Sequence, residues 1–388
     1  MKKIFLLLIA LIYLSPLQLM ALPVPTDQSQ KFKPATIKVL LAKLADDALI
    51  EVRGLYHIYN PQSDLLVISG AFNKRDRIIT SKEGIKWGEL FPGLFQIRIV
   101  PAQSDTSILV NGIQYRGCIE IYSIAGTINV VNEIDIESYL KSSLAMQFSQ
   151  PMNDEVLDAV AIVARTNIYY LAGKNPNASW HIDLNESDYE GYGLTFQNQA
   201  VDNAVERTRH CILTYRDSPF AAMWTENSAG RTASPSKIFR RALQTPEGVV
   251  APEAQKTRQK HSWSFSITRQ ELAKLVELGG IKEIDVYEDK LSGKVYAVRL
   301  TDGASSKDID FFHIQDLLGK KHLLSNDFSL SVQGEKITFK GFGTGAGVGL
   351  CLYSASAMAK KQEKASAILA TFFPGTELVK RRTFSEVE

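Results

Sequence analysis

Two segments rich in small residues are the candidates for close contact with a ligand. Residues 341–349 read GFGTGAGVG, and glycines let a backbone approach a ligand closely. The segment lacks the Gly-Lys-Ser/Thr ending of a phosphate-binding loop, so we interpret it as a tight turn against a ligand groove. A purely structural turn is the open alternative. Residues 228–232, SAGRT, follow an aromatic run at 220–224, an arrangement that suits a saccharide groove as well as an ordinary loop.

Residues for nucleophilic or metal chemistry are scattered along the chain. The sequence assembles no Ser/His/Asp triad from its six histidines, although His181 and Asp183 have the spacing of neighbours on one strand face. Its three cysteines lie far apart without a CxxC pair, so no zinc cluster, other metal site or cofactor is indicated. We expect them to be small apolar side chains, with one disulfide as an alternative; they are Cys118, Cys211 and Cys351.

The first 21 residues have the pattern of a signal for export of the protein. Lys2 and Lys3 precede an apolar run at 4–14 that is shorter than the ~20 residues a membrane-spanning helix needs. We expect a signal peptide at 1–21 and a linker at 22–35, which places the protein outside the cytoplasm, in the periplasm or cell envelope. An uncleaved signal would be its one contact with a membrane. The net charge of +2 gives no reason to expect nucleic acid as a partner.

The order of elements predicts an α+β fold. Short β-rich runs separated by turns indicate a small β-rich N-terminal domain at 36–110. Strands and helices without regular alternation follow in a larger domain at 111–378, before a tail at 379–388. We expect hairpins at 119–131, 211–224, 284–300 and 330–340, and helices at 270–278, 353–361 and 365–372.

Two further helices precede the small-residue loops. Asp135 is suited to accept hydrogen bonds from the free amides at a helix start, and Ile136, Tyr139 and Leu140 share one face of that helix. Asn153 is the expected N-cap of the next helix, and its apolar stripe indicates a face in the core.

Five segments in order resemble the SpoIID/LytB family. Residues 131–140, VNEIDIESYL, resemble its signature V-N-x-h-x-L-E-x-Y-L, where h is apolar. Residues 155–166, EVLDAVAIVART, resemble its E-A-L-K-A-Q-A-V-A-A-R-T helix, and residues 205–209 loosely match V-x-x-T-x-G. Ser228, Gly230 and Thr232 match S-x-G-x-T, and residues 341–358 resemble the closing glycine-rich segment.

The resemblance implies a SpoIID-like core with packed helices and an activity on peptidoglycan. Family members are lytic transglycosylases that cleave after N-acetylmuramic acid in glycan strands stripped of stem peptides. A single Glu is thought to give and then take the proton, as glycosidic chemistry requires.

This chain departs from the family at the residues that carry chemistry. The catalytic Glu falls on Gln147, whose amide has no acidic proton to give near neutral pH. Its loss removes a general-acid contribution of about 10²–10⁴-fold. The family's loop His falls on Ala346, and Asn185 stands where some members have a zinc-binding Cys.

Three functions follow from these departures. The favoured hypothesis is a protein that binds or remodels glycan strands, with Gln147 replacing the acid. The second is an active lytic transglycosylase that uses Glu226 or Glu190, and the third is an adaptor that recruits cell-wall or division proteins through residues 36–110. Arg231 is the candidate for a muramoyl carboxylate, or else a solvated surface residue. The expected substrate-binding residues are Ser228, Gly230, Arg231, Gly343, Gly345 and Gly347.

Overall fold

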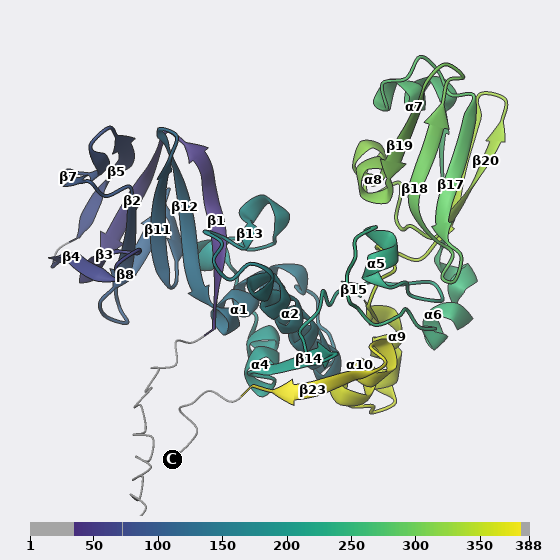
Figure 1. Cartoon of the computed structure of the whole chain (residues 1–388). Coiled ribbons are helices and arrows are strands. Elements are labelled where there is room, and N and C mark those ends of the chain that lie inside the picture. Colours follow the sequence, from purple (N-terminus) through teal and green to yellow (C-terminus); the bar gives the residue numbers. More distant parts are fainter. Residues whose placement is uncertain (1–34, 72, 382–388) are drawn as a thin grey trace, which may run out of the picture. The chain divides into compact units, whose positions relative to one another are not determined.

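The computed structural model describes residues 35–71 and 73–381 and has the predicted α+β class (Figure 1). The expected signal peptide and most of the linker and tail lie outside the described residues. The last strand, β23 (Thr376–Lys380), extends past residue 378, where the tail was expected to begin.

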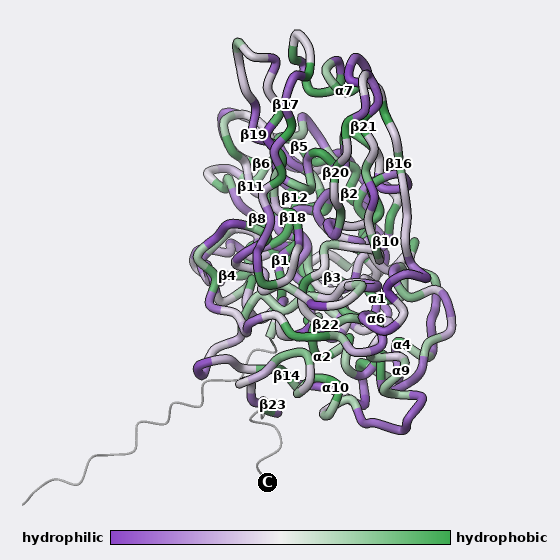
Figure 2. Tube along the Cα trace, turned by 90° about the vertical axis from the view of Figure 1, so that its right-hand side faces the viewer, coloured by the Kyte–Doolittle hydropathy of each residue, from purple (hydrophilic) through white to green (hydrophobic). Residues whose placement is uncertain are grey.

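Two sheets form the N-terminal β region. The strands of the first sheet are β1 (Thr36–Ala45), β3 (Tyr56–Asn60), β4 (Leu65–Gly70), β8 (Gln96–Pro101), β11 (Cys118–Ile124), β12 (Thr127–Asp135) and β13 (Ile182–Asp183). Those of the second are β2 (Asp47–Arg53), β5 (Lys74–Ser81), β6 (Gly84–Trp87), β7 (Glu89–Pro92), β9 (Ser107–Val110) and β10 (Ile113–Tyr115). Buried apolar side chains from both sheets belong to one continuous core. Figure 2 shows hydrophobic and hydrophilic residues interspersed along the chain.

The first sheet joins segments from both sides of the expected boundary at residue 110. Its order is β13-β1-β12-β11-β8-β3-β4, and β1 pairs antiparallel with β12 from Thr36 opposite Asp135 to Ala45 opposite Ile128. Removing residues 36–110 would therefore take β1 out of a sheet that also contains β11 and β12. The division into two domains stays a prediction.

Helices that follow β12 pack on the same core. They are α1 (Ile136–Gln147), α2 (Asp154–Lys174), α4 (Gln199–Arg207), α6 (Pro252–Lys256), α9 (Leu352–Lys360) and α10 (Ala365–Phe372). Two shorter helices lie outside this core: α3 (Gly191–Leu194) packs on β10, and α5 (Pro235–Ile238) places Ile238 in a small separate cluster. The caps predicted for the first two are confirmed, since Asp135 accepts from the amides of Glu137 and Ser138, and Asn153 from that of Glu155.

The hairpin expected at 211–224 is wrong. The first strand, β14 (Cys211–Tyr215), pairs instead with β23 at the far end of the chain. Only the end of the aromatic run is a strand, β15 (Trp224–Thr225), and it pairs in parallel with β22 (Leu350–Cys351). The local turn forms, since Arg216 and Asp217 both have positive φ and Tyr215 pairs with Ser218, but the pairing stops there and β14 is bound along its length by β23 instead.

Residues 262–342 form a module with a hydrophobic core of its own. Its elements are β16 (Ser262–Thr268), α7 (Arg269–Leu275), β17 (Glu283–Asp289), β18 (Lys294–Thr301), β19 (Ser306–Asp310), α8 (Phe311–Leu318), β20 (Phe328–Gln333) and β21 (Lys336–Phe342). The hairpins expected at 284–300 and 330–340 are confirmed as β17–β18 and β20–β21. The module begins and ends side by side, because Ser262 pairs with Phe342.

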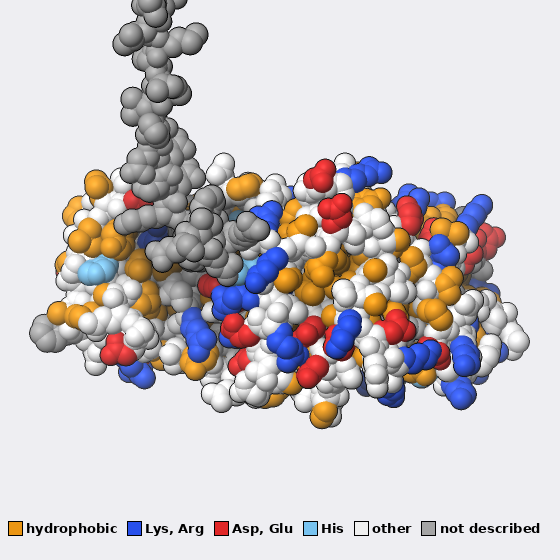
Figure 3. Space-filling view, turned by 90° about the horizontal axis from the view of Figure 1, so that it is seen from below, with side chains coloured by type: hydrophobic (Ala, Val, Ile, Leu, Met, Phe, Trp, Pro, Cys, Tyr) orange, Lys and Arg blue, Asp and Glu red, His pale blue; other side chains and the backbone are white. Residues whose placement is uncertain are grey.

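Charges on the face seen in Figure 3 are of both signs, with Lys and Arg side chains interspersed among Asp and Glu. Among the described residues the three cysteines form no disulfide with one another; Cys351 is buried, and Cys118 and Cys211 are partly buried. Within residues 35–71 and 73–381, no helix is long and apolar enough to cross a membrane.

Candidate functional site

Helix α1 carries Gln147 on its last turn. Asp135 fixes where the helix begins, through hydrogen bonds of 3.0 and 3.2 Å from the first free amides. The helix ends at Gln147, after which the amide of Phe148 bonds to the carbonyl of Leu144. The side chain of Gln147 is thereby held at a helix end, exposed to solvent.

Gln147 lines a pocket of about 170 Å³. The walls come from α1, α2, the segment 182–188 and Trp224 of β15. The Gln147 amide nitrogen donates a 2.7 Å hydrogen bond to Oδ2 of Asp188, and Glu186 also lines the pocket. The pocket therefore contains a neutral amide and two carboxylates, one of which is bonded to that amide.

Aromatic side chains give the pocket an apolar wall. The ring of Trp224 lies 5.9 Å from that of Phe148, and Tyr139 lies 5.2 Å from Tyr189 between ring centroids. Burial, reinforced by the Asp188 carboxylate, raises the pKa of Tyr139 to about 12, so its phenol keeps its proton at neutral pH. Aromatic faces with a few fixed polar groups are typical of small-ligand sites.

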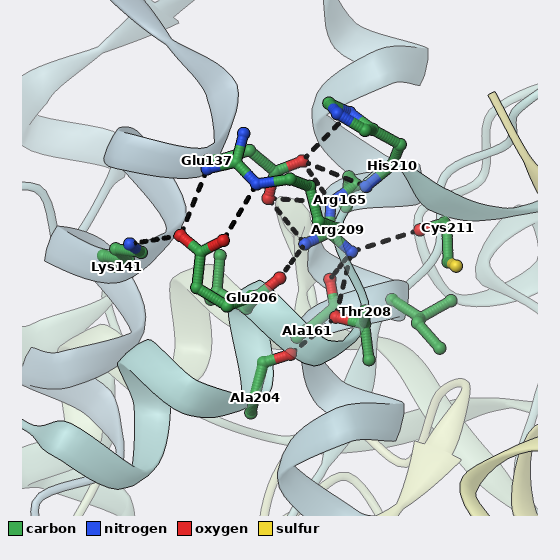
Figure 4. Close-up of polar contacts among 12 residues, drawn as sticks. Glu137, Lys141, Ala161, Arg165, Ala204, Glu206, Thr208, Arg209, His210 and Cys211 are labelled. Atoms are coloured by element: carbon green, nitrogen blue, oxygen red, sulfur yellow. Dashed lines mark hydrogen bonds and ion pairs between the residues drawn. The ribbon is translucent and has the colours of Figure 1, made fainter. Parts of the chain in front are cut away.

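A buried ion pair holds together the helices that carry the pocket (Figure 4). Arg165 of α2 is fully buried and binds Glu137 of α1 through two donors, at 2.9 and 2.7 Å. Its remaining donors reach the carbonyls of Val205 and Cys211. Because α1, α2, α4 and β14 all meet at this guanidinium, it fixes the angle between the two helices that line the pocket.

The two small-residue segments contact each other. Asn227 pairs with Thr344, and the Gly347 carbonyl accepts from the amide of Ala233. Gly343 has φ of +73°, and a Cβ there would lie 2.3 Å from the Asn227 carbonyl oxygen, so only glycine fits this approach. We conclude that the glycines serve close packing between the segments; contact with a ligand stays a prediction.

Most residues expected at the site do not line this pocket. Ser228 is buried, with its amide 3.4 Å from Sγ of Cys351, and Gly230 is buried beside it. Arg231 donates to the carbonyl of Gly248 at 2.8 Å. Glu226 and Glu190 are exposed, and neither belongs to the residues around Gln147. Trp224 connects the pocket to these segments, because its strand pairs with β22 directly after the glycines.

Asp188 and Glu186 are pocket residues that the sequence did not reveal, whereas Trp224 ends the aromatic run at 220–224 that the sequence connected with a saccharide groove. The first two lie in a polar, irregular segment between β13 and α3, whose path the sequence pattern does not fix. The one signal was their position shortly after His181 and Asp183, whose spacing indicated only neighbours on one strand face.

His181 and Asp183 serve local structure. Nδ1 of His181 accepts the amide of Lys38, and burial lowers the pKa of this imidazole. Asp183 accepts the amide of Asn185 at the start of a short 3₁₀ turn. Among the described residues, no group of three or more His, Cys, Asp or Glu side chains could hold a metal ion.

Comparison with known proteins finds one family model and several relatives. The family model described as Stage II sporulation protein (SpoIID) matches residues 125–215. An uncharacterized protein of Chlamydia pneumoniae is 36% identical over 185 residues, which cover 47% of this chain and 66% of that protein. A protein of Brachyspira hyodysenteriae is 28% identical over 88% of this chain and 92% of its own length. Stage II sporulation protein D of Bacillus subtilis is 25% identical over 66% of this chain and 77% of its own length. The ion pair and pocket helices fall within the matched region, and the chain belongs to the SpoIID family.

Proposed function

We propose that this protein acts on the bacterial cell wall, by binding peptidoglycan glycan strands in the pocket at Gln147 without cleaving them. Family membership supports a role in sporulation or at the cell wall. The expected export signal at 1–21 would place the protein where such strands lie, and fractionation of cells would test that location.

One contact carries the proposal, the 2.7 Å hydrogen bond from Gln147 to Asp188 on the wall of the pocket. An ionised carboxylate accepts hydrogen bonds and gives none, and a carboxamide has no acidic proton. The pair can therefore hold sugar hydroxyl and amide groups, but as arranged it offers no proton to a glycosidic oxygen. Trp224 adds an aromatic surface on which a sugar ring can pack.

Binding is tested with purified glycan strands freed of stem peptides. We expect Asp188→Ala to weaken binding by about 2–10-fold, the effect of one hydrogen bond. Glu190→Gln is the matched control, because this exposed carboxylate lies outside the pocket. If the control weakens binding as much as Asp188→Ala does, the strand lies elsewhere and the proposal fails.

The second candidate is turnover through a different carboxylate. The pocket favours Asp188 or Glu186 for this role over the expected Glu226 and Glu190, since only the first two line it. The discriminating measurement is mass spectrometry of strands after incubation with the protein. Anhydro-muramoyl ends that disappear with Asp188→Asn would establish this candidate in place of simple binding.

A further inference from the structure

A second pocket, of about 110 Å³, lies on another side of α1. Ser138, Lys141 and Ser142 contribute from the helix, at the spacing of neighbours on one helical face. Tyr192 of α3 and Phe196, which follows that helix, also line the pocket. Gln147 and its carboxylate neighbours belong to the other pocket, so the two sites use different faces of the same helix.

The wall of this second pocket is fixed in place. Gly191 has φ of +73°, and a Cβ there would lie 2.7 Å from the ring of Tyr115, so α3 packs tightly on β10. The Ser142 hydroxyl bonds to that of Thr195 and to the Gly191 carbonyl. Asn198 donates to the Phe148 carbonyl at 2.8 Å. A ligand would meet a site that is already formed.

Charge and aromatic surface combine at the mouth of the pocket. The Arg116 guanidinium lies 3.9 Å from the centre of the Tyr192 ring, and its side chain has no carboxylate partner among the described residues. Lys141 is paired with Glu206 at 2.6 Å. Tyr192 and Phe196 line the pocket and are 40% and 43% exposed, so a ligand can reach both rings.

Asp202 is the one carboxylate among the lining residues. Arg116 and Lys141 line the same pocket, and Glu206 offsets the charge of Lys141. Arg209 shares Glu206 in turn, through a 2.9 Å bond. The side chain left to attract an anion is Arg116, whose planar donors suit a carboxylate.

We propose that this pocket binds a carboxylate carried on a sugar or short peptide, with Arg116 as its partner and Tyr192 and Phe196 packing on the ligand's body. The volume is below the range of about 300–1,000 Å³ for drug-sized ligands, so it admits one small group. The Gln147 pocket repels an anion, because Asp188 and Glu186 line it. The carboxylate role expected for Arg231 thus passes to Arg116.

The source of the carboxylate rests on the proposed function. In peptidoglycan it is either the lactyl group of muramic acid or the C-terminus of a stem peptide. Three probes separate these sources, namely N-acetylmuramic acid, N-acetylglucosamine, which lacks the lactyl group, and D-alanyl-D-alanine. Their binding to the purified full chain is measured by ligand-observed NMR and calorimetry.

We expect N-acetylmuramic acid or the dipeptide to bind, and the stronger of the two identifies the source. Arg116→Gln should weaken that binding at least about tenfold, the effect of one charge-assisted bond. Arg53→Gln, at a 58% exposed arginine on β2, is the control and should change nothing. Equal binding of N-acetylglucosamine, or unchanged binding in Arg116→Gln, overturns the inference. The inference is also overturned if Asp188→Ala abolishes binding and Arg116→Gln does not, a result that would leave the proposed function intact.

Discussion

Restoring a carboxylic acid at position 147 is the sharpest perturbation that the pocket offers. In Gln147→Glu, an oxygen replaces the amide nitrogen that lies 2.7 Å from Oδ2 of Asp188. Two carboxylates at that distance cannot both ionise without repulsion, so the pair retains one proton to higher pH. That proton is the acid which the natural pair lacks.

The size of the effect follows from the distance. Both side chains are exposed, so a water-like dielectric applies, and unit charges 2.7 Å apart repel by about 1.5 kcal/mol. This corresponds to about one pH unit, which moves the titration of the carboxyl introduced by Gln147→Glu from about 4.3 to between about 5 and 6. A general acid contributes about 10²–10⁴-fold, which sets the expected gain in cleavage.

The assay is the release of anhydro-muramoyl ends from stem-free strands between pH 4 and 8, followed by mass spectrometry. We expect product from Gln147→Glu and none from the natural protein, with a rate that falls about tenfold per pH unit above the titration. Adding Asp188→Asn removes the repulsion, so the falling limb should move down by about one pH unit. Gln147→Ala is the inactive control.

Two results would refute this reasoning. If Gln147→Glu binds strands but yields no product at any pH, the pocket does not hold the scissile bond beside position 147. If the pH profile is the same with and without Asp188→Asn, the two side chains are not coupled as the 2.7 Å contact requires.

Three other perturbations test the scaffold around the pocket. Glu137→Gln leaves the buried charge of Arg165 without its partner and should lower the free energy of unfolding in urea by about 3–5 kcal/mol; a loss below about 1 kcal/mol would contradict the account of this ion pair. Hydrogen bonds from two basic side chains lower the pKa of Glu206 to about 2, below its ordinary 4.5. A carboxyl depressed in this way stabilises the fold above pH 4.5 and loses that contribution as pH falls toward 2, so Glu206→Gln should flatten the acid limb of a melting-temperature profile; an unchanged limb counts against the contact. Gly345→Ala should lower the free energy of unfolding in urea by about 1–3 kcal/mol more than Gly334→Ala does. Both glycines have positive φ, but only at Gly345 would a Cβ lie 2.5 Å from another side chain. Equal losses of stability would mean that the neighbouring side chain moves away.

Local signals in the sequence predicted the helices that carry the pocket. Asp135 and Asn153 are caps whose side chains act on amides within three residues, so no distant contact is needed to recognise them. The position of Gln147 followed from the family signature. Its role at a pocket did not, because the partner Asp188 comes from an irregular segment that no periodic pattern describes.

Pairing between distant strands accounts for what the sequence missed. β14 lies beside a strand at the end of the chain, and Trp224 is positioned by β22 rather than by a hairpin. Each is a contact between segments more than a hundred residues apart, which turn residues alone cannot signal. Ser228 was expected at the groove because small residues suit both a ligand surface and tight packing, and it is buried.

The chain enters and leaves the module at 262–342 through two neighbouring residues, His261 and Gly343. The Gly343 amide donates a 2.9 Å hydrogen bond to the His261 carbonyl. A foreign domain with adjacent termini could therefore be spliced in at this point without stretching the chain on either side. One requirement would remain for such a graft. Lys294 of the module donates to the Ser228 carbonyl at 2.5 Å, so any replacement must bring its own donor to that buried oxygen.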